Sequence, residues 1–275
     1  MPTYTRGATA WDIARPQRPS RVPGLTMAGF GIRELDTLRM VPHPAVTLIL
    51  EFGAGSPVVE SASGERQQGC VAAGTGAGSR GAIQASGKNI ECVQVRLSPV
   101  IARAVLGVPL ADLDGAIVPL DALWGREAPR IRERLADTTS WQQRFALTDA
   151  LLARRYAAQR PVDKEIAWAW HRIATTHGRT RVDALATETG WTRKRLWSRF
   201  HVQLGLPPKQ AIKLIRFDHA AHRLLAGVPA ARVAAESGYA DQSHLHRDVM
   251  TYTGRTPATV SAEPFLAVDD IAWPN

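Results

Sequence analysis

The sequence predicts a two-domain α+β protein, with a β-rich N-terminal half that ends in helices and an all-α C-terminal half. Up to Leu97, short apolar stretches alternate with glycine-rich turns, which is typical of an antiparallel sheet, sandwich or small barrel. After Pro99 the apolar residues recur with a helical period, and two similar helix, glycine-turn, helix patterns follow. With 275 residues the chain is long enough for two domains. We place them at residues 1–160 and 161–262, followed by a tail at 263–275.

The N-terminal half is expected to hold five strands and then four helices. The expected strands are residues 46–52, 57–59, 69–73, 81–85 and 90–97. In the last of these, Val93, Val95 and Leu97 alternate with other residues, which is the period of a strand with two different faces. The expected helices are residues 99–106, 120–124, 128–135 and 141–156. The charged stretch 154–160, which precedes Pro161, predicts the linker to the second half.

The first of the two repeated patterns begins with a short amphipathic helix. Val182, Leu185 and Ala186 have the spacing of one buried helical face, and Gly190 ends the helix. We expect Thr180 to cap the N-terminus of this helix.

A glycine turn and a basic helix complete this pattern. Thr192 is expected to cap a helix over residues 193–204, which Gly205 closes. This is the layout of a helix-turn-helix unit. Residues 232–249 repeat it around Gly238. Residues 208–226 predict one continuous helix of roughly 19 residues between the units, or about 28 Å, which suits adjacent major grooves about 34 Å apart.

The C-terminal half resembles the AraC family of transcription regulators, whose DNA-binding domain has two helix-turn-helix units joined by a long helix. The resemblance rests on Gly238-Tyr-Ala-Asp-Gln-Ser-His-Leu-His-Arg247, on Thr253-Gly-Arg-Thr-Pro257 and on the linker segment Gly205-Leu-Pro-Pro-Lys. It covers about residues 165–262. Val249 stands where the family usually has an aromatic residue, and Met250 stands where a lysine is common.

The resemblance extends more weakly to the N-terminal half. Residues 106–113 and 118–124 are similar to those of AraC-type regulators with a cupin-like sensor domain. This implies a cupin-like N-terminal domain that binds an effector or forms dimers. It also implies RNA polymerase as a partner if the protein activates transcription.

The faces of the first basic helix predict its contacts with double-stranded DNA. Leu196 and Phe200 are expected to point inward. The expected DNA-binding residues on the outer side are Arg193, Lys194, Arg195, Trp197, Ser198, Arg199 and His201. Similarity to the family assigns Lys194, Trp197 and Ser198 to bases and the three arginines to phosphates. The alternative for Trp197 is packing against the linker helix.

The faces of the helix that follows Gly238 likewise predict its contacts with DNA. Leu245 and Val249 are expected to point inward. The expected DNA-binding residues are Gln242, Ser243, His244, His246 and Arg247. Gln242 suits adenine and Arg247 suits guanine. The alternative for the two histidines is a solvated surface.

The distribution of charge favours DNA binding by the first unit. The chain has 34 Lys and Arg against 25 Asp and Glu, a net charge of +9. Residues 161–235 hold 13 basic and 5 acidic side chains, a net charge of +8, whereas residues 236–275 hold 2 and 6, a net charge of −4. We therefore expect less phosphate affinity from the second unit, and a looser grip.

These observations predict a sequence-specific transcription regulator that is controlled by a small molecule or by dimerisation through its N-terminal half. The alternative is a ligand-independent regulator whose N-terminal half only dimerises or contacts a protein partner. An enzyme is not expected, and neither is a cofactor. A metal-dependent cupin needs about three ligands, whereas His43 is the only histidine before residue 161. The glycine-rich residues 74–81 lack the ending of a phosphate-binding loop and predict a hairpin.

Three smaller expectations concern the cysteines, the location and the chain ends. Cys70 and Cys92 form no Cys-x-x-Cys pair, so reduced thiols are expected, with a redox switch between them as the alternative.

No signal peptide and no apolar run of about 18 residues is visible, so we expect a cytoplasmic protein without membrane contact. Residues 1–23 and 263–275 are expected to be loosely held, although Trp11 and Trp273 hint at docking.

Overall fold

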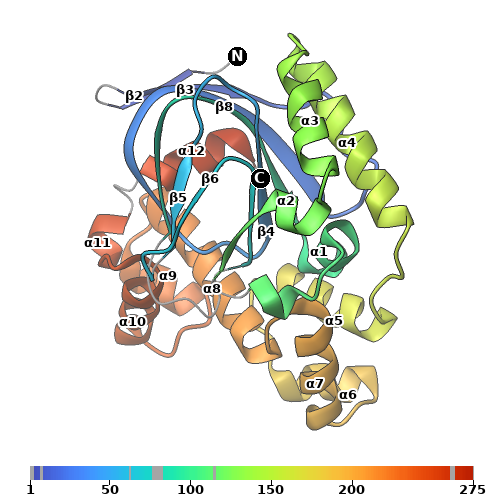
Figure 1. The fold of residues 1–275 in the computed structure, drawn as a ribbon. Coiled ribbons are helices and arrows are strands. Elements are labelled where there is room, and N and C mark those ends of the chain that lie inside the picture. The colour runs from blue at the N-terminus through green and yellow to red at the C-terminus, as the bar shows by residue number, and fades with distance from the viewer. Residues whose placement is uncertain are drawn as a thin grey trace.

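A computed structural model of the chain describes residues 3–6, 9–61, 63–75, 83–113, 116–260 and 264–274. Strands form the N-terminal half, four helices follow them, and the C-terminal half is helical (Figure 1). The predicted fold class is therefore confirmed. Most of the expected glycine-rich hairpin lies outside the described residues.

The N-terminal half is built on one strongly curved antiparallel sheet with the strand order β1-β2-β3-β8-β4-β7-β9, and β5 joins β8 to β6. The strands are β1 Thr3–Arg6, β2 Thr9–Ala14, β3 Leu25–Met40, β4 Val46–Glu51, β5 Val58–Glu60, β6 Arg66–Gln68, β7 Val71–Ala73, β8 Ile83–Leu97 and β9 Ile117–Pro119. The long strands β3 and β8 pair from Leu25↔Leu97 to Met40↔Ile83, with a register shift between Leu35 and Leu38. The sequence predicted parts of this sheet but not the continuous strand β3.

The two faces of the sheet are covered by different parts of the chain. Val93, Val95 and Leu97 face the helices that follow the sheet, and all three are fully buried. These helices are α1 Pro99–Leu106, α2 Leu120–Trp124, α3 Glu127–Ala136 and α4 Trp141–Ala157, with a short 3-10 helix, η1, at Leu110–Leu113. The hollow inner face, which we call the barrel interior, is closed by the C-terminal half of the chain.

The predicted linker at residues 154–160 starts too early. Arg154 and Arg155 belong to the last turn of α4, where both pair with Glu127 of α3. Arg155 also donates hydrogen bonds to the carbonyl oxygens of Val105 and Leu106, at the end of α1. These contacts extend the helix, so the connection between the halves begins at residue 158.

The C-terminal half follows the predicted order of helices. They are α5 Lys164–Thr175, α6 Val182–Thr189, α7 Arg193–Leu204, α8 Pro208–Leu225, α9 Ala230–Glu236, α10 Gln242–Thr253, α11 Pro257–Val260 and α12 Pro264–Ala272. The Thr192 cap is confirmed, because its hydroxyl accepts a hydrogen bond from the backbone N–H of Arg195 at 3.2 Å. The Thr180 cap is wrong. Arg181 occupies the N-cap position of α6 and makes no side-chain capping bond.

The described residues near both ends of the chain are paired or packed, in contrast to the expectation that these segments are loosely held. Residues Thr9–Ala14 form β2 and pair with β3, and residues Pro264–Ala272 form α12, which packs against β2, β3 and α8. The two tryptophans dock as their presence suggested. Trp11 lies edge-on to Phe30 at 6.1 Å between ring centroids, and Trp273 lies 5.8 Å from the same ring. Within the described ranges, no helix has the length and apolarity needed to cross a membrane.

Candidate nucleic-acid interface

The first unit consists of α6, the turn at Gly190 and α7. Gly190 adopts a left-handed conformation with φ +68°, which lets the chain reverse within three residues. Leu185 of α6 and Leu196 and Phe200 of α7 have no exposed surface, so the two helices form one packed pair. This burial fixes which face of α7 is presented to solvent.

The outer face of α7 carries the side chains that the sequence assigned to DNA. Six of the seven are exposed, and they are Arg193, Lys194, Arg195, Trp197, Ser198 and Arg199. Half of the surface of Trp197 is exposed, and its ring stacks on the ring of His201 at 5.2 Å. An indole held rigidly by a neighbour of its own helix is available to a partner.

The second unit repeats this construction with α9, a left-handed Gly238 at φ +77° and α10. The Asp241 side chain caps α10 by accepting a hydrogen bond from the backbone N–H of His244 at 2.7 Å. Leu245 and Val249 have no exposed surface, so a valine at position 249 leaves the core of this unit closed. Four of the five predicted contact residues are exposed, and they are Gln242, Ser243, His246 and Arg247.

Helix α8 joins the two units. Its 18 residues correspond to about 27 Å of helix, in agreement with the predicted spacer. Leu214, Phe217 and Ala220 are fully buried along its inner side. Figure 1 shows α6 and α7 at one end of α8 and α9 and α10 at the other. The relative placement of the units therefore depends on a single rigid element.

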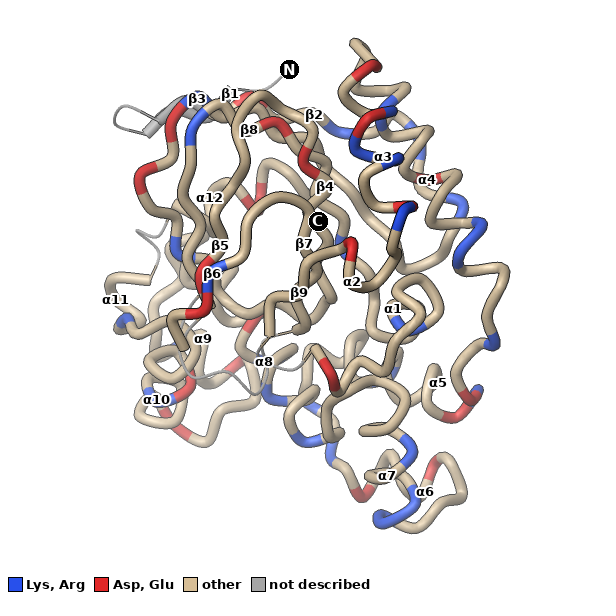
Figure 2. Tube along the Cα trace, in the orientation of Figure 1, with Lys and Arg blue, Asp and Glu red and all other residues tan. Residues whose placement is uncertain are grey.

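The charges are distributed unevenly over the two units. Residues 161–235 have a net charge of +8 and residues 236–275 have a net charge of −4. In Figure 2, Lys and Arg positions can be followed along α5 to α8, and acidic positions recur around α9 and α10. The first unit is therefore the stronger electrostatic site for a polyanion.

Comparison with protein families adds the decisive observation. Residues 185–263 match the family described as a helix-turn-helix domain, which spans both units. The C-terminal region is an AraC-type helix-turn-helix domain. This domain type supports a role in DNA-binding transcription regulation.

The matches among solved structures are distant in sequence. ToxT from Vibrio cholerae O395 is 9% identical, with a TM-score of 0.49, over 88% of this chain and 98% of ToxT. The C-terminal domain of AraT from Geobacillus stearothermophilus is 18% identical, with a TM-score of 0.35, over 37% of this chain and 86% of that domain. The AraC-like transcriptional activator CuxR is 13% identical, with a TM-score of 0.29, over 86% and 90%. A search of the curated proteins found no match.

Within the AraC-type domain, two histidines differ from their expected orientation. His201 is half-buried, and its Nδ1 atom is buried without a hydrogen-bond partner in the described part of the chain. His244 is also half-buried, edge-on to Tyr239 at 5.1 Å, with Nε2 3.3 Å from Nη2 of Arg216. Both were expected to face outward because helical spacing places them beside the exposed residues. The expectation failed because each ring packs against a neighbouring side chain.

Several cations of the first unit already have partners. Nε of Arg193 lies 2.5 Å from Asp183, and Arg195 lies over the ring of Trp191 at 4.6 Å. Arg199 donates two hydrogen bonds to Asp163, at 2.9 and 2.6 Å. Burial opposes ionisation of Asp163, but the bonds from Arg199, together with Gln203 and the charge of Arg195, hold the pKa of this carboxyl below its usual value. A phosphate that binds Arg199 must compete with this carboxylate.

A buried acid that the sequence analysis missed anchors the second reading helix. Asp248 of α10 is buried and pairs with two cations of α8, Lys213 at 3.0 Å and Arg216 at 3.1 Å. The signal was present in the sequence, because Asp248 follows Leu245 by three residues and therefore lies on the inward face of the helix. An acid in that position requires buried cations.

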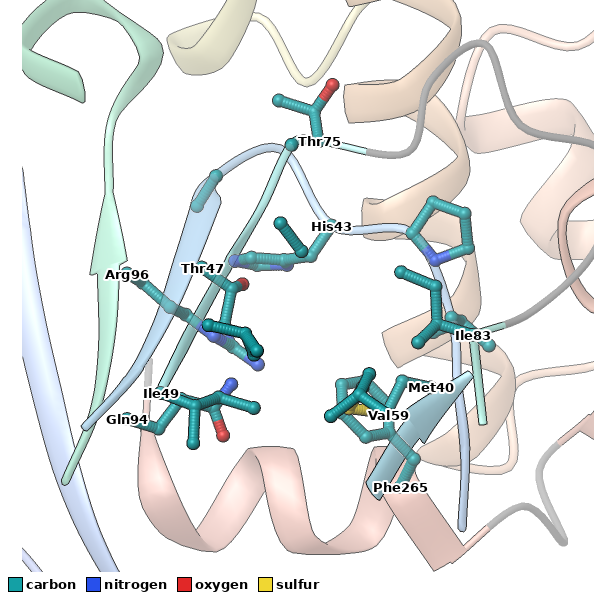
Figure 3. Close-up of a pocket in the computed structure, with 16 residues that line it drawn as sticks. Met40, His43, Thr47, Ile49, Val59, Thr75, Ile83, Gln94, Arg96 and Phe265 are labelled. Atoms are coloured by element: carbon teal, nitrogen blue, oxygen red, sulfur yellow. The ribbon is translucent and has the colours of Figure 1, made fainter. Parts of the chain in front are cut away.

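The barrel interior contains a cavity of only about 50 Å³ (Figure 3). One wall carries Thr47, Gln94 and Arg96, and Phe265 of α12 closes the cavity from below. His43, the single histidine of residues 1–160, bonds Asp218 of α8 at 2.8 Å. No group of three or more potential metal ligands occurs among the residues that the structure describes.

The two cysteines lie on either side of strand β4. Cys92 pairs with Glu51 in the sheet, and the Cys70 thiol donates to the carbonyl oxygen of Glu51 at 3.4 Å. Burial raises the pKa of Cys70 to about 11 and that of Cys92 to about 12. Both thiols therefore stay protonated at neutral pH, which favours the expected reduced thiols over a redox switch.

Proposed function

We propose that the chain is a sequence-specific regulator that places α7 and α10 in two adjacent major grooves of double-stranded DNA. The observation that carries this proposal is the pair of capped, outward-facing helices on one continuous helix of 18 residues. A spacer of about 27 Å suits units that face grooves about one helical turn, or 34 Å, apart.

We assign the contacts by exposure. Lys194, Trp197 and Ser198 of α7 would read bases, and Gln242 and Arg247 of α10 would do the same. Arg193, Arg195 and Arg199 would hold phosphates, with Ser243 and His246 at the edge of the second site. His201 and His244 would position their neighbours, because their rings are engaged within the protein.

The proposal also assigns a separate role to each segment of the chain. Residues 161–262 would bind DNA, residues 1–160 would carry the regulatory input or the dimer contact, and residues 263–275 would form a separate C-terminal segment. RNA polymerase would be a partner if the regulator activates transcription.

One observation favours the ligand-independent alternative for the N-terminal half. Small-molecule pockets usually enclose about 300–1,000 Å³, whereas the barrel cavity encloses about 50 Å³, room for one or two water molecules. In the conformation described, the barrel interior is therefore closed to an effector. An effector that binds inside the barrel would need part of that interior to open.

The proposal is tested by selecting genomic DNA fragments on the purified full-length protein at about 150 mM salt and sequencing them. A motif with two blocks about one helical turn apart is expected. The matched control is Trp197→Ala, which removes an exposed ring and should leave the fold intact while the block read by α7 loses information. Binding without any motif, in both proteins, would contradict sequence-specific reading.

Effector control and dimerisation are separated by two further measurements on the same protein. A small molecule that binds the folded state at 100 times its dissociation constant adds about 2.7 kcal/mol of stability, which a thermal-shift screen detects. Sedimentation analysis reports dimers directly. Stabilisation by a ligand supports effector control, and a dimer with no stabilising ligand supports the alternative.

A further inference from the structure

The C-terminal helix α12 occupies the open side of the barrel. Four of its apolar residues are buried against the sheet and α8, and they are Phe265, Leu266, Val268 and Ala272. Phe265 forms the floor of the cavity in Figure 3. The small size of that cavity is therefore a consequence of α12 as well as of the strands.

An ion pair between buried groups anchors α12 inside the barrel. Arg96 of β8 makes a two-point contact with Asp269 of α12, and each side chain is only 5% exposed. Trp273 covers the other side of the guanidinium, with its ring centroid 3.6 Å from Cζ. A cation inside a sheet requires such a partner, because an unpaired buried charge is strongly disfavoured.

On the side of the cavity, the Arg96 guanidinium has one nitrogen that makes no hydrogen bond among the described residues. Arg96 lines the cavity, and its Nε atom is buried without a hydrogen-bond partner in the described residues. Asp269 is the carboxylate in direct contact with the guanidinium, and the charge of Asp218 acts on it from farther away. Loss of Asp269 would remove the directly bonded partner of a buried cation.

The same helix is tied to the spacer of the DNA-binding units. His222 of α8 bonds Asp270 at 2.9 Å and lies 3.5 Å from Asp269. Asp218, one turn earlier on α8, bonds His43 of the N-terminal half. A continuous line of polar contacts thus runs from β8 through α12 to α8 and back to the sheet.

We propose that the barrel opening is a binding site for an acidic amphipathic helix and that α12 occupies this site. In that position α12 acts as a strap that fixes α8 to the barrel. The Arg96–Asp269 pair is the anchor of this strap. Release of the strap would enlarge the barrel cavity and loosen the spacing of the two reading helices. The last consequence rests on the proposed DNA-binding function, whereas the strap itself does not.

The strap is tested by hydrogen exchange on the full-length protein without DNA. In Asp269→Asn, amides of residues 266–272 should exchange at least ten-fold faster than in the unchanged protein, with the protection of α7 and α10 retained. Asp270→Asn is the comparison variant, since it removes the same charge and the His222 contact from the same helix but leaves the Arg96 anchor in place. Equal protection of α12 in both variants would overturn the anchor.

Phe265→Ala is the second variant, because it removes an apolar contact without leaving a charge uncompensated. Faster exchange confined to α12 in this variant supports the strap. If Phe265→Ala either leaves α12 fully protected or speeds exchange along the whole chain, α12 is an inseparable part of the core and the proposal fails.

Coupling to DNA is measured separately on fragments that carry both blocks of the selected motif or one block. Asp269→Asn should bind the two-block fragment about three- to ten-fold more weakly and the one-block fragment unchanged, because a looser spacer must be ordered on binding. If Asp269→Asn and the unchanged protein bind the two-block fragment with equal affinity, α12 does not affect the spacing of the two units. The hydrogen-exchange result would still stand. Failure to find any motif would count against the proposed function and not against the strap.

Discussion

The two helix-turn-helix units share one architecture but differ in how their reading helices are held. Helix α7 is surrounded by exposed cations and paired mainly through surface contacts, such as Arg193 with Asp183 and Arg199 with Asp163. Helix α10 is fastened to α8 through buried Asp248 and its two cations. The first unit is therefore suited to attracting a polyanion, and the second unit to holding its helix α10 in a fixed position on α8.

This difference changes the expectation that the second unit is the looser one. Its lower positive charge still predicts less affinity for phosphates. The buried network around Asp248 and Arg216 nevertheless gives α10 a defined orientation on the spacer. Weak attraction and rigid placement are separate properties, and the following predictions test them separately.

The largest expected effect is on the anchor of α10. Asp248→Ala should lower the free energy of unfolding by about 3 kcal/mol, because it leaves Lys213 and Arg216 facing a buried site without their acid. Urea unfolding measures this loss. Glu236→Gln, at an exposed ion pair of the same unit, should cause no comparable change. A stable Asp248→Ala protein would show that α10 is held by its apolar residues alone.

The next effect concerns base reading by the second unit. Arg247→Ala should weaken binding to the selected motif by roughly 1–3 kcal/mol and relax discrimination at one base pair. Titration against the motif and against single-base variants measures both quantities. An equal loss on unrelated DNA would assign Arg247 to the phosphate backbone instead.

A smaller effect is expected from the first unit, where attraction should matter more than base reading. Arg199→Ala should weaken binding to all sequences alike and reduce the slope of log K against log salt by about one. Asp163→Asn should act in the opposite direction, since it releases Arg199 from its carboxylate. If Asp163→Asn leaves affinity unchanged, Arg199 does not contact DNA.

The smallest effect lies where the segment between α5 and α6 contacts the spacer α8. His177, which precedes α6, stacks on His219 of α8 at 4.2 Å. Partial burial, and then the nearby charges of His177, Arg223 and Arg179, lower the pKa of His219 below 6.5. The unfolded chain therefore takes up a proton that the folded chain resists, so stability should fall as pH decreases below 6.5. Thermal unfolding from pH 7 to 5 should show a shallower decline in His219→Gln, and an identical decline would exclude this pair as a cause.

Much of the helical half could be predicted because its signals are local. Apolar spacing and glycine turns defined α6, α7 and α8 to within one residue at most, and Thr192 was identified as a cap. The same reasoning placed Leu196, Phe200, Leu245 and Val249 in the core. Capping and one-sided burial depend on residues within one or two helical turns, so the sequence contains the necessary information.

The remaining features depend on residues far apart in the chain. Nothing beside Arg96 in the sequence indicates that Asp269, 173 positions later, neutralises it inside the barrel. The surroundings of His244 were misjudged for the same reason, since Arg216 of α8 lies beside it. The strand β2 was missed because it is completed by pairing with β3. The sequence by itself determined two helix-turn-helix units on a spacer of fixed length. Only the tertiary structure decided which cations are already paired and what fills the barrel, because compensation of a buried charge depends on distance in space and not along the chain.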